Sequence, residues 1–159
     1  EYLRSLGLDW GEENTIVGIA ARFHPIKDLP TLLRGFALAW RQRPELRLLI
    51  AGDGQDRDAL EALAVELGID SVTCFAGWQS DVDSFYRALD INTLTSLSET
   101  FPYALTEGAR AHLPTVASRV GGVPLLIRDR EHGLLFTAGD HEALGRCLVE
   151  LAERTAEEK

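Results

Sequence analysis

Short apolar runs alternate with helix-like segments along the chain, and this alternation restricts the fold more than any other feature of the sequence. The runs are rich in leucine and β-branched residues, as strands buried on both faces of a sheet are. They lie at residues 16–21, 48–51, 72–75, 91–97, 115–117 and 134–136. Between them, apolar residues recur at three- and four-residue steps, the period of a helix. The alternation predicts right-handed crossovers and one α/β domain with a Rossmann-like, doubly wound parallel sheet of about six strands.

Residues that start and stop helices stand at the ends of the periodic segments. Asp28 and Ser80 occupy predicted N-cap positions, where a short polar side chain can accept bonds from free N–H groups. Pro30 and Pro102 fall in predicted first turns, where a missing N–H is tolerated. Gly68 follows the periodic segment 60–67 as a C-terminal stop. These signals predict helices that open close to residues 29, 81 and 102.

The charge balance excludes one class of partner. The chain carries 16 Lys and Arg against 25 Asp and Glu, a formal net charge of −9, which opposes sequence-independent binding to nucleic acid or anionic lipid. No apolar run approaches the roughly 18 residues that a membrane span requires, so we expect no integral membrane segment. Cys74 and Cys147 lack metal-ligand spacing and are interpreted as small buried residues in a reducing compartment. We therefore expect a cytoplasmic location.

The ends of the sequence indicate an excised domain. The chain of 159 residues begins at Glu1 and contains no Met. Its length falls within the ~100–200 residues of a usual domain, so we expect residues 1–159 to form one domain of a longer protein.

Two glutamates stand where the fourth apolar run gives way to a helix-like segment. Glu99 precedes Pro102, and Glu107 would lie about one and a half turns into the helix that Pro102 opens. In an open parallel sheet, this kind of junction faces the ligand crevice, and free N–H groups at the helix start bind anions. Two carboxylates there indicate hydroxyl recognition or acid–base chemistry beside a phosphate. Candidate phosphate donors are the backbone N–H groups of Phe101, Tyr103 and Ala104.

Two cations follow the first apolar run. In a Rossmann strand order the first and fourth strands are neighbours, so the loop with Arg22 and Lys27 would face the loop with Glu99. Cations and a carboxylate would then share one cleft, where Arg22 and Lys27 can stabilise a negatively charged ligand without a metal.

The order and spacing of several short motifs carry a family resemblance over roughly residues 14–150. The motifs are Gly18-Ile19-Ala20-Ala21-Arg22 with Lys27, Ala51-Gly52-Asp53-Gly54, Phe75-Ala76-Gly77, Glu99 with Glu107, Pro114-Thr115-Val116-Ala117-Ser118 with Gly121-Gly122, and Gly133-Leu134-Leu135-Phe136 with Gly139-Asp140. Together they resemble the C-terminal domain of family 4 (group 1) retaining glycosyltransferases.

The resemblance implies the nucleotide-sugar half of a GT-B enzyme. That enzyme would transfer a hexose-type sugar from a nucleoside diphosphate sugar to an acceptor hydroxyl, with retention and without a cofactor or metal. Arg22 and Lys27 would stabilise the diphosphate, Glu99 would lie near the donor sugar, and Glu107 would bind the ribose. Whether Glu99 is a nucleophile, an electrostatic stabiliser or a sugar ligand stays open. The half that binds the acceptor, and any peripheral membrane contact, would precede Glu1, so the chain alone is expected to bind donor but scarcely to transfer.

Two positions depart from the pattern of the resembling family, and a third residue is a candidate contact of the nucleobase. Thr100 replaces the Gly that usually follows the first Glu, so the identity of the donor sugar stays undetermined. His112 replaces the Gly that commonly ends the helix, so a left-handed backbone is expected there at a cost of about 1 kcal/mol. Trp78, after the third apolar run, is a candidate to pack against the nucleobase.

Other functions would account for some of these motifs. The run Gly52–Arg57 lacks the third Gly of a dinucleotide fingerprint, and the Asp-x-Asp motifs at 56–58 and 81–83 fall in predicted first turns, where acidic side chains complement the helix dipole. A glycosidase would explain two carboxylates but not Arg22 and Lys27. The remaining alternatives are a regulatory or receiver-like α/β module, for which Asp53 and Asp90 form a poor acidic cluster, and a sugar-nucleotide epimerase of the same fold.

Overall fold

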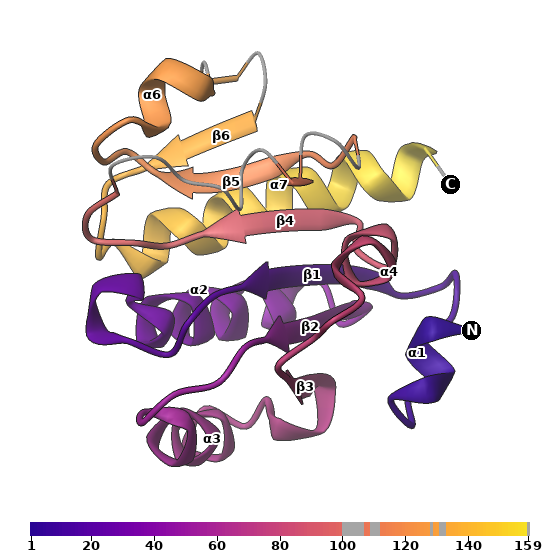
Figure 1. Ribbon diagram of the computed structural model, residues 1–159. Helices are drawn as coiled ribbons and strands as arrows, with labels where there is room; N and C mark the ends of the chain where they lie inside the picture. The colour runs from indigo at the N-terminus through magenta and orange to yellow at the C-terminus, as the bar shows by residue number, and fades with distance from the viewer. Residues whose placement is uncertain (100–106, 109–111, 128, 131–132, 159) are drawn as a thin grey trace.

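The computed structural model describes residues 1–99, 107–108, 112–127, 129–130 and 133–158. Within them, six strands form one parallel sheet in the order β3-β2-β1-β4-β5-β6, which confirms the predicted Rossmann-like fold (Figure 1). The strands are β1 (Thr15–Ala20), β2 (Leu46–Ala51), β3 (Thr73–Gly77), β4 (Ile91–Leu94), β5 (Thr115–Ser118) and β6 (Gly133–Phe136).

Helices cover both faces of this sheet (Figure 1). The described α-helices are α1 (Tyr2–Ser5), α2 (Leu29–Gln42), α3 (Arg57–Glu66), α4 (Val82–Arg87), α6 (Val123–Leu126) and α7 (His141–Glu158), and the short 3₁₀ helices are η1 (Pro25–Lys27) and η2 (Asp70–Val72). Helices α2, α3 and α7 lie on one face, with α2 packed along α7. Helix α4 and the N-terminal α1 pack on the other.

Apolar residues of the central strands enter cores on both faces. In β2, Leu48 and Ile50 join the core beneath α2 and α7, whereas Leu49 and Ala51 join the core beneath α4. Successive side chains of a strand point to opposite faces, so a strand covered on both sides needs apolar residues at every position. This explains the unbroken apolar runs in the sequence.

The fourth predicted run was too long. Strand β4 ends at Leu94, and the residues up to Leu97 leave the sheet. Thr95 donates its hydroxyl to the carbonyl of Lys27 at 2.8 Å, and the N–H of Leu97 bonds to the carbonyl of Ile26 at 2.8 Å. Bonds to the loop after β1 therefore replace the ladder of the sheet.

Most of the predicted helix boundaries are correct. Asp28 is the N-cap residue of α2, with a left-handed backbone (φ 49°), and Pro30 lies in its first turn. Gly68 ends α3 with φ 75°, and His112 has the expected left-handed φ of 58°. The N-cap of α4 is Asp81 rather than Ser80, because the Asp81 carboxylate accepts a bond from the Ser84 N–H at 3.1 Å.

Both cysteines are half-buried free thiols rather than fully buried residues. Burial raises the pKa of the Cys74 thiol, and it does the same for Cys147. Among the described residues, no helix combines the length and the hydropathy that crossing a bilayer demands.

Candidate functional site

The carboxyl ends of the parallel strands meet at one edge of the sheet, on the left in Figure 1. Strand β1 pairs with β2 on one side and with β4 on the other, so the chain's direction of winding changes between β1 and β4. Ligands of open α/β sheets bind outside the strand ends at such a switch point. The loops after β1 and β4 carry the predicted charged residues to this point.

Lys27 and Glu99 form an ion pair across the switch point. The Lys27 Nζ lies 2.7 Å from the Glu99 Oε2, and the same oxygen accepts a bond from the Ser96 hydroxyl at 2.7 Å. The Glu99 side chain is only 10% exposed and that of Lys27 27%. The expectation that the two loops face each other is confirmed.

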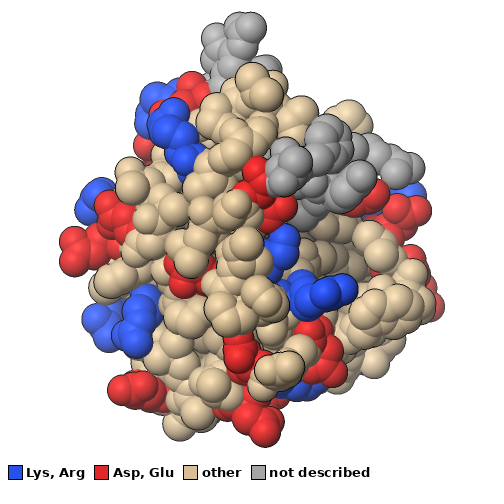
Figure 2. All heavy atoms as spheres, turned by 60° about the vertical axis from the view of Figure 1, so that its left-hand side comes forward, with Lys and Arg blue, Asp and Glu red and all other residues tan. Residues whose placement is uncertain are grey.

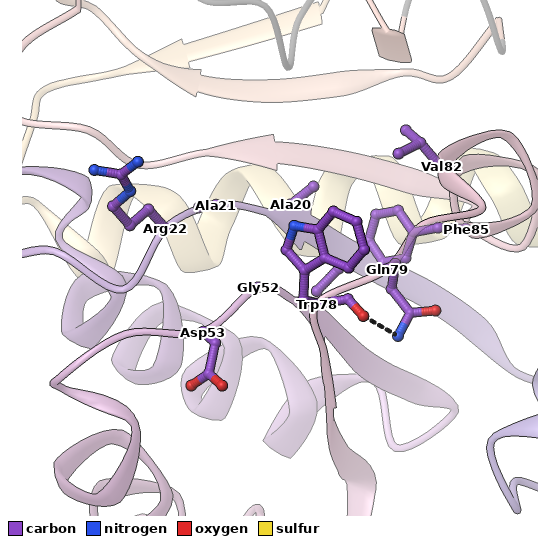
Figure 3. Close-up of a pocket in the computed structure, with 10 residues that line it drawn as sticks. Ala20, Ala21, Arg22, Gly52, Asp53, Trp78, Gln79, Val82 and Phe85 are labelled. Carbon is purple, nitrogen blue, oxygen red and sulfur yellow. Dashed lines mark hydrogen bonds between the residues drawn. The ribbon is translucent and has the colours of Figure 1, made fainter.

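Arg22, in the same loop as Lys27, borders a pocket of about 400 Å³. The pocket opens between the carboxyl ends of the first three strands and the start of α4. It is lined by Ala20, Ala21, Arg22, Ala51, Gly52, Asp53, Trp78, Gln79, Val82 and Phe85. Figure 3 shows Arg22 at one end of the pocket, Val82 and Phe85 at the other, and Trp78 between them. Trp78 is 77% exposed, so one face of a large aromatic ring is available to a ligand.

Close backbone approach shapes the floor of this pocket. Gly52 has φ +129°, and a Cβ at this position would lie 1.9 Å from the carbonyl oxygen of Ala21. The loops after β1 and β2 can therefore touch only because residue 52 has no side chain.

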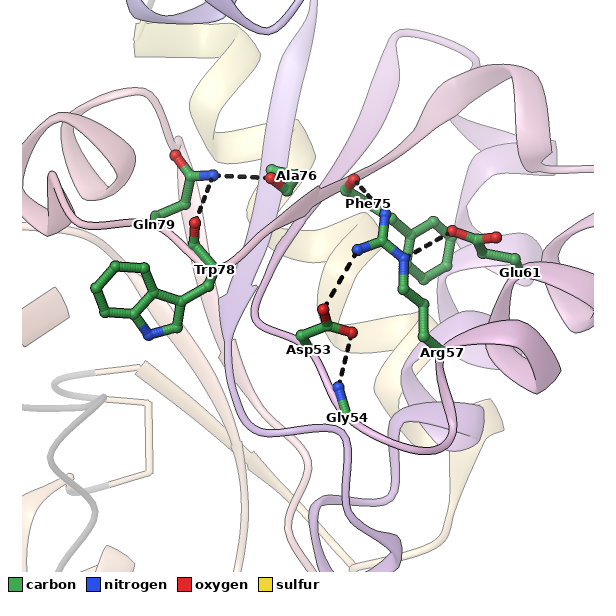
Figure 4. Close-up of polar contacts among 8 residues, drawn as sticks. All are labelled: Asp53, Gly54, Arg57, Glu61, Phe75, Ala76, Trp78 and Gln79. Carbon is green, nitrogen blue, oxygen red and sulfur yellow. Dashed lines mark hydrogen bonds and ion pairs between the residues drawn. The ribbon is translucent and has the colours of Figure 1, made fainter.

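Two polar side chains hold the pocket walls (Figure 4). The Arg57 guanidinium lies 3.8 Å from the Asp53 carboxylate, bonds to Glu61 at 3.0 Å and bonds to the Phe75 carbonyl at 3.4 Å. It thus joins the loop after β2 to α3 and β3. In the sequence, Arg57 stands only in the run 52–57 and in the Asp-x-Asp motif at 56–58, neither of which predicted its role. The signal that could have identified its ion pairs is its spacing of four residues from both Asp53 and Glu61.

Gln79 is the second of these side chains. Its amide nitrogen bonds to the carbonyls of Ala76 at 2.8 Å and Trp78 at 3.4 Å, and its oxygen accepts a bond from the Tyr2 hydroxyl at 2.6 Å. Burial, and then the charge of Asp81, raises the pKa of Tyr2. Gln79 therefore ties the Trp78 loop to α1, a link between residues far apart in sequence that the sequence analysis missed.

Glu107 lies close enough to Tyr86 of α4 for its charge to affect that side chain. Burial, followed by the charge of Glu107, raises the pKa of Tyr86 to about 12. The next residue, Gly108, packs so closely on β4 that a Cβ would lie 2.4 Å from the Asn92 side chain. The other predicted donors, Phe101, Tyr103 and Ala104, lie outside the described residues, as do Thr100 and Pro102.

The remaining candidates have local structural roles. The His24 ring is exposed, and its Nδ1 accepts a bond from the Ile26 N–H at 3.2 Å. Asp81 and Asp56 are the N-cap residues of α4 and α3, as their motifs predicted for helix starts, and the bonds from Ser84 hold the pKa of Asp81 below its usual value. Asp53 follows β2 whereas Asp90 precedes β4, so parallel strands place these two carboxylates at opposite edges of the sheet.

Charges of both signs surround the strand ends. Figure 2 shows Lys and Arg side chains beside a hollow near the centre of this face, with Asp and Glu side chains around it. In the part of the chain that the structure describes, no three His, Cys, Asp or Glu side chains gather into a possible metal site.

The chain is similar to known proteins in sequence and in fold. The family model for group 1 glycosyl transferases matches residues 7–158. The lipopolysaccharide core biosynthesis glycosyltransferase LpsE of Rhizobium meliloti is 32% identical over 91% of this chain, and a D-inositol 3-phosphate glycosyltransferase of Saccharomonospora viridis is 37% identical over 87% of it.

A solved structure, Anabaena HepE in complex with UDP and glucose, superimposes on 98% of the chain with a TM-score of 0.87 and 25% identity. The chain spans 41%, 35% and 42% of LpsE, the Saccharomonospora viridis protein and HepE, respectively, and so less than half of each. The match to the family model over nearly the whole chain shows that this protein belongs to the group 1 glycosyltransferases.

Proposed function

We propose that this chain is the domain of a retaining glycosyltransferase that binds the donor, a nucleoside diphosphate sugar of the hexose type. The observation that carries the proposal is the juxtaposition of Arg22, Lys27 and Glu99 at the switch point of the sheet, beside a pocket with an exposed tryptophan. The structural relative HepE, which binds UDP and glucose, supports UDP as the first nucleotide to test.

The diphosphate would lie between Arg22 and Lys27. Arg22 borders the pocket, and the ammonium of Lys27, five residues later in the same loop, lies 2.7 Å from Glu99. As the bond from the sugar to the phosphate breaks, negative charge builds on the leaving diphosphate, and fixed cations stabilise it. The N–H groups of Phe101, Tyr103 and Ala104 remain proposed further donors, and the proposal requires no metal or cofactor.

The nucleoside would extend from the diphosphate along the pocket. Trp78 offers an aromatic face for the base, and the apolar side chains of Val82 and Phe85 close the end of the pocket. Glu107, near α4, would accept bonds from the two ribose hydroxyls.

Glu99 would lie beside the donor sugar, on the opposite side of the diphosphate from the base. Its carboxylate can accept bonds from sugar hydroxyls or stabilise positive charge at the anomeric carbon as the diphosphate leaves. An acceptor hydroxyl would then attack on the face from which the diphosphate departs, with retention. We propose that a second domain, N-terminal to this one in the full-length enzyme, binds the acceptor.

Calorimetry tests the proposal directly. UDP, GDP and ADP are titrated into the chain in the presence of EDTA and again with Mg²⁺. We expect at least one diphosphate to bind equally well in both conditions. Binding that requires Mg²⁺, or the failure of all three nucleotides to bind, would contradict the proposed function.

A further inference from the structure

A group of buried hydroxyls lies behind the Lys27–Glu99 ion pair. Thr95 and Ser96 follow β4, Ser118 ends β5, and all three are fully buried. The Thr95 hydroxyl donates to the carbonyl of Lys27, and the Ser118 hydroxyl donates to the carbonyl of Ser96 at 2.7 Å. Side chains of this size and burial are usually apolar, so the hydroxyls need a reason to be there.

Ser96 makes the bond that bears on the site. Its hydroxyl and the Lys27 ammonium both donate to the Glu99 Oε2, each at 2.7 Å. Within the described residues, both side-chain hydrogen bonds to the Glu99 carboxylate end at Oε2. Oε1 is therefore the oxygen that we expect to accept a bond from a ligand.

The backbone of Glu99 is fixed as well. The loop after β5 passes so close that a Cβ at Gly121, where φ is +50°, would lie 1.6 Å from the Glu99 carbonyl oxygen. The Gly122 N–H points to the same oxygen at 3.4 Å. With the main chain held on this side, the freedom left to Glu99 is rotation of its side chain, which Ser96 restrains.

We propose that Ser96 is a positioning residue that keeps the Glu99 carboxylate directed at the donor sugar, and that Ser118 supports it from behind. This inference rests on the proposed function. A diphosphate between Arg22 and Lys27 would compete with Glu99 for the Lys27 ammonium, and the ion pair with Glu99 would weaken. Ser96, whose fully buried hydroxyl bonds to Oε2 at 2.7 Å, is then the donor that keeps Oε2 in place.

The experiment separates the sugar from the nucleotide. Affinities for UDP and UDP-glucose are measured for the wild-type chain, Ser96→Ala, Glu99→Ala and the double variant. We expect Ser96→Ala to weaken UDP-glucose binding about tenfold while UDP binding changes by less than about twofold. In the Glu99→Ala background, Ser96→Ala should cause no further loss, because its partner is absent.

Two variants control for general damage. Thr93→Val removes another fully buried hydroxyl from β4, one that bonds to the Gly18 carbonyl at 2.8 Å, and should leave both affinities unchanged. Ser118→Ala, which loses only the support behind Ser96, should weaken UDP-glucose binding by about threefold and remains informative if Ser96→Ala unfolds.

The outcomes are distinguishable. Equal losses for UDP and UDP-glucose, or a loss that persists without Glu99, would overturn the role of Ser96. A wild-type chain that binds neither of these ligands, and neither GDP nor ADP, would instead overturn the proposed function. Denaturant unfolding of the same four proteins tests the hydrogen bond without any ligand, and additive effects of Ser96→Ala and Glu99→Ala on stability would also overturn the positioning role.

Discussion

The two halves of the site are built in opposite ways. Around β4 and β5, the Lys27–Glu99 pair is largely buried; the Ser96 hydroxyl donates to Glu99, and the Ser118 hydroxyl donates to the Ser96 carbonyl. Around β2 and β3, the Trp78 pocket is open, mostly apolar and bordered by a ring that is 77% exposed. A developing charge needs fixed partners at one point, whereas an aromatic base needs a broad flat surface. In the proposed function, the reacting end of the donor would therefore lie in the first region and the nucleoside in the second.

The largest expected effect concerns the acceptor, which neither region of this chain is expected to bind. No acceptor would be positioned against the donor sugar in the isolated chain, so transfer should be negligible, because orientation of the reactants supplies about 7–11 kcal/mol of the barrier in favourable cases. A radiolabelled UDP-sugar is incubated with the chain and an acceptor panel. Robust turnover by residues 1–159 would show that the site needs no second domain.

The charged region should act on every nucleotide alike. Arg22→Ala and Lys27→Ala should each weaken binding of UDP by ~1.5–3 kcal/mol, the range for a hydrogen bond to a charged group. The loss should be similar for UDP and for inorganic pyrophosphate, which lacks a base. Calorimetry provides the affinities, with Arg41→Ala, at the far end of α2, as a charge-matched control. A loss of affinity for UDP but not for pyrophosphate would indicate that these cations contact the nucleoside rather than the diphosphate.

Glu107 should act on the ribose. Glu107→Ala should weaken UDP by about tenfold or more, since 1.4 kcal/mol is a factor of ten. The same substitution should leave the affinity for the 2′,3′-dideoxy analogue nearly unchanged. The four affinities give a coupling energy, and a coupling near zero would mean that Glu107 does not touch the ribose hydroxyls.

The aromatic face of the pocket should respond to the base alone. Trp78→Ala should cost about 1 kcal/mol of UDP affinity, because stacking on an aromatic ring contributes on that order, whereas Trp78→Phe should retain much of it. Pyrophosphate binding should not change in either variant. Equal behaviour of Ala and Phe at this position would argue that Trp78 is an incidental surface residue.

The smallest effect is expected at the polar wall of the pocket. Arg57 is a third exposed, and such ion pairs contribute only about 0.2–1 kcal/mol. Arg57→Ala should therefore weaken UDP binding about twofold by loosening the loops after β2 and β3. Arg154→Ala, which removes an exposed pair with Glu150 on α7, is the matched control and should leave UDP binding unchanged. An equal change in UDP affinity in both variants would show that the Arg57 contacts have no specific effect on the pocket.

The sequence by itself determined the fold and the charged half of the site. Apolar runs separated by helical periods specify a parallel sheet, and the order of a Rossmann sheet brings Lys27 to Glu99 across 72 positions of chain. The left-handed backbone at His112 was expected only from the family resemblance, in which a Gly commonly stands at that place. The sheet and the Lys27–Glu99 contact did not need the resemblance. These features depend on residue type and spacing alone.

Only the tertiary structure decided the shape of the Trp78 pocket and the placement of the hydroxyls behind Glu99. Serine and threonine fit loops, caps and strands equally well, so nothing in the sequence marks Ser96 and Ser118 as partners. The same holds for Gln79, whose bond to Tyr2 joins residues 77 positions apart. Hydrogen bonds between distant uncharged side chains follow no period in the sequence, because they form only after the strands and loops that carry them have been brought together.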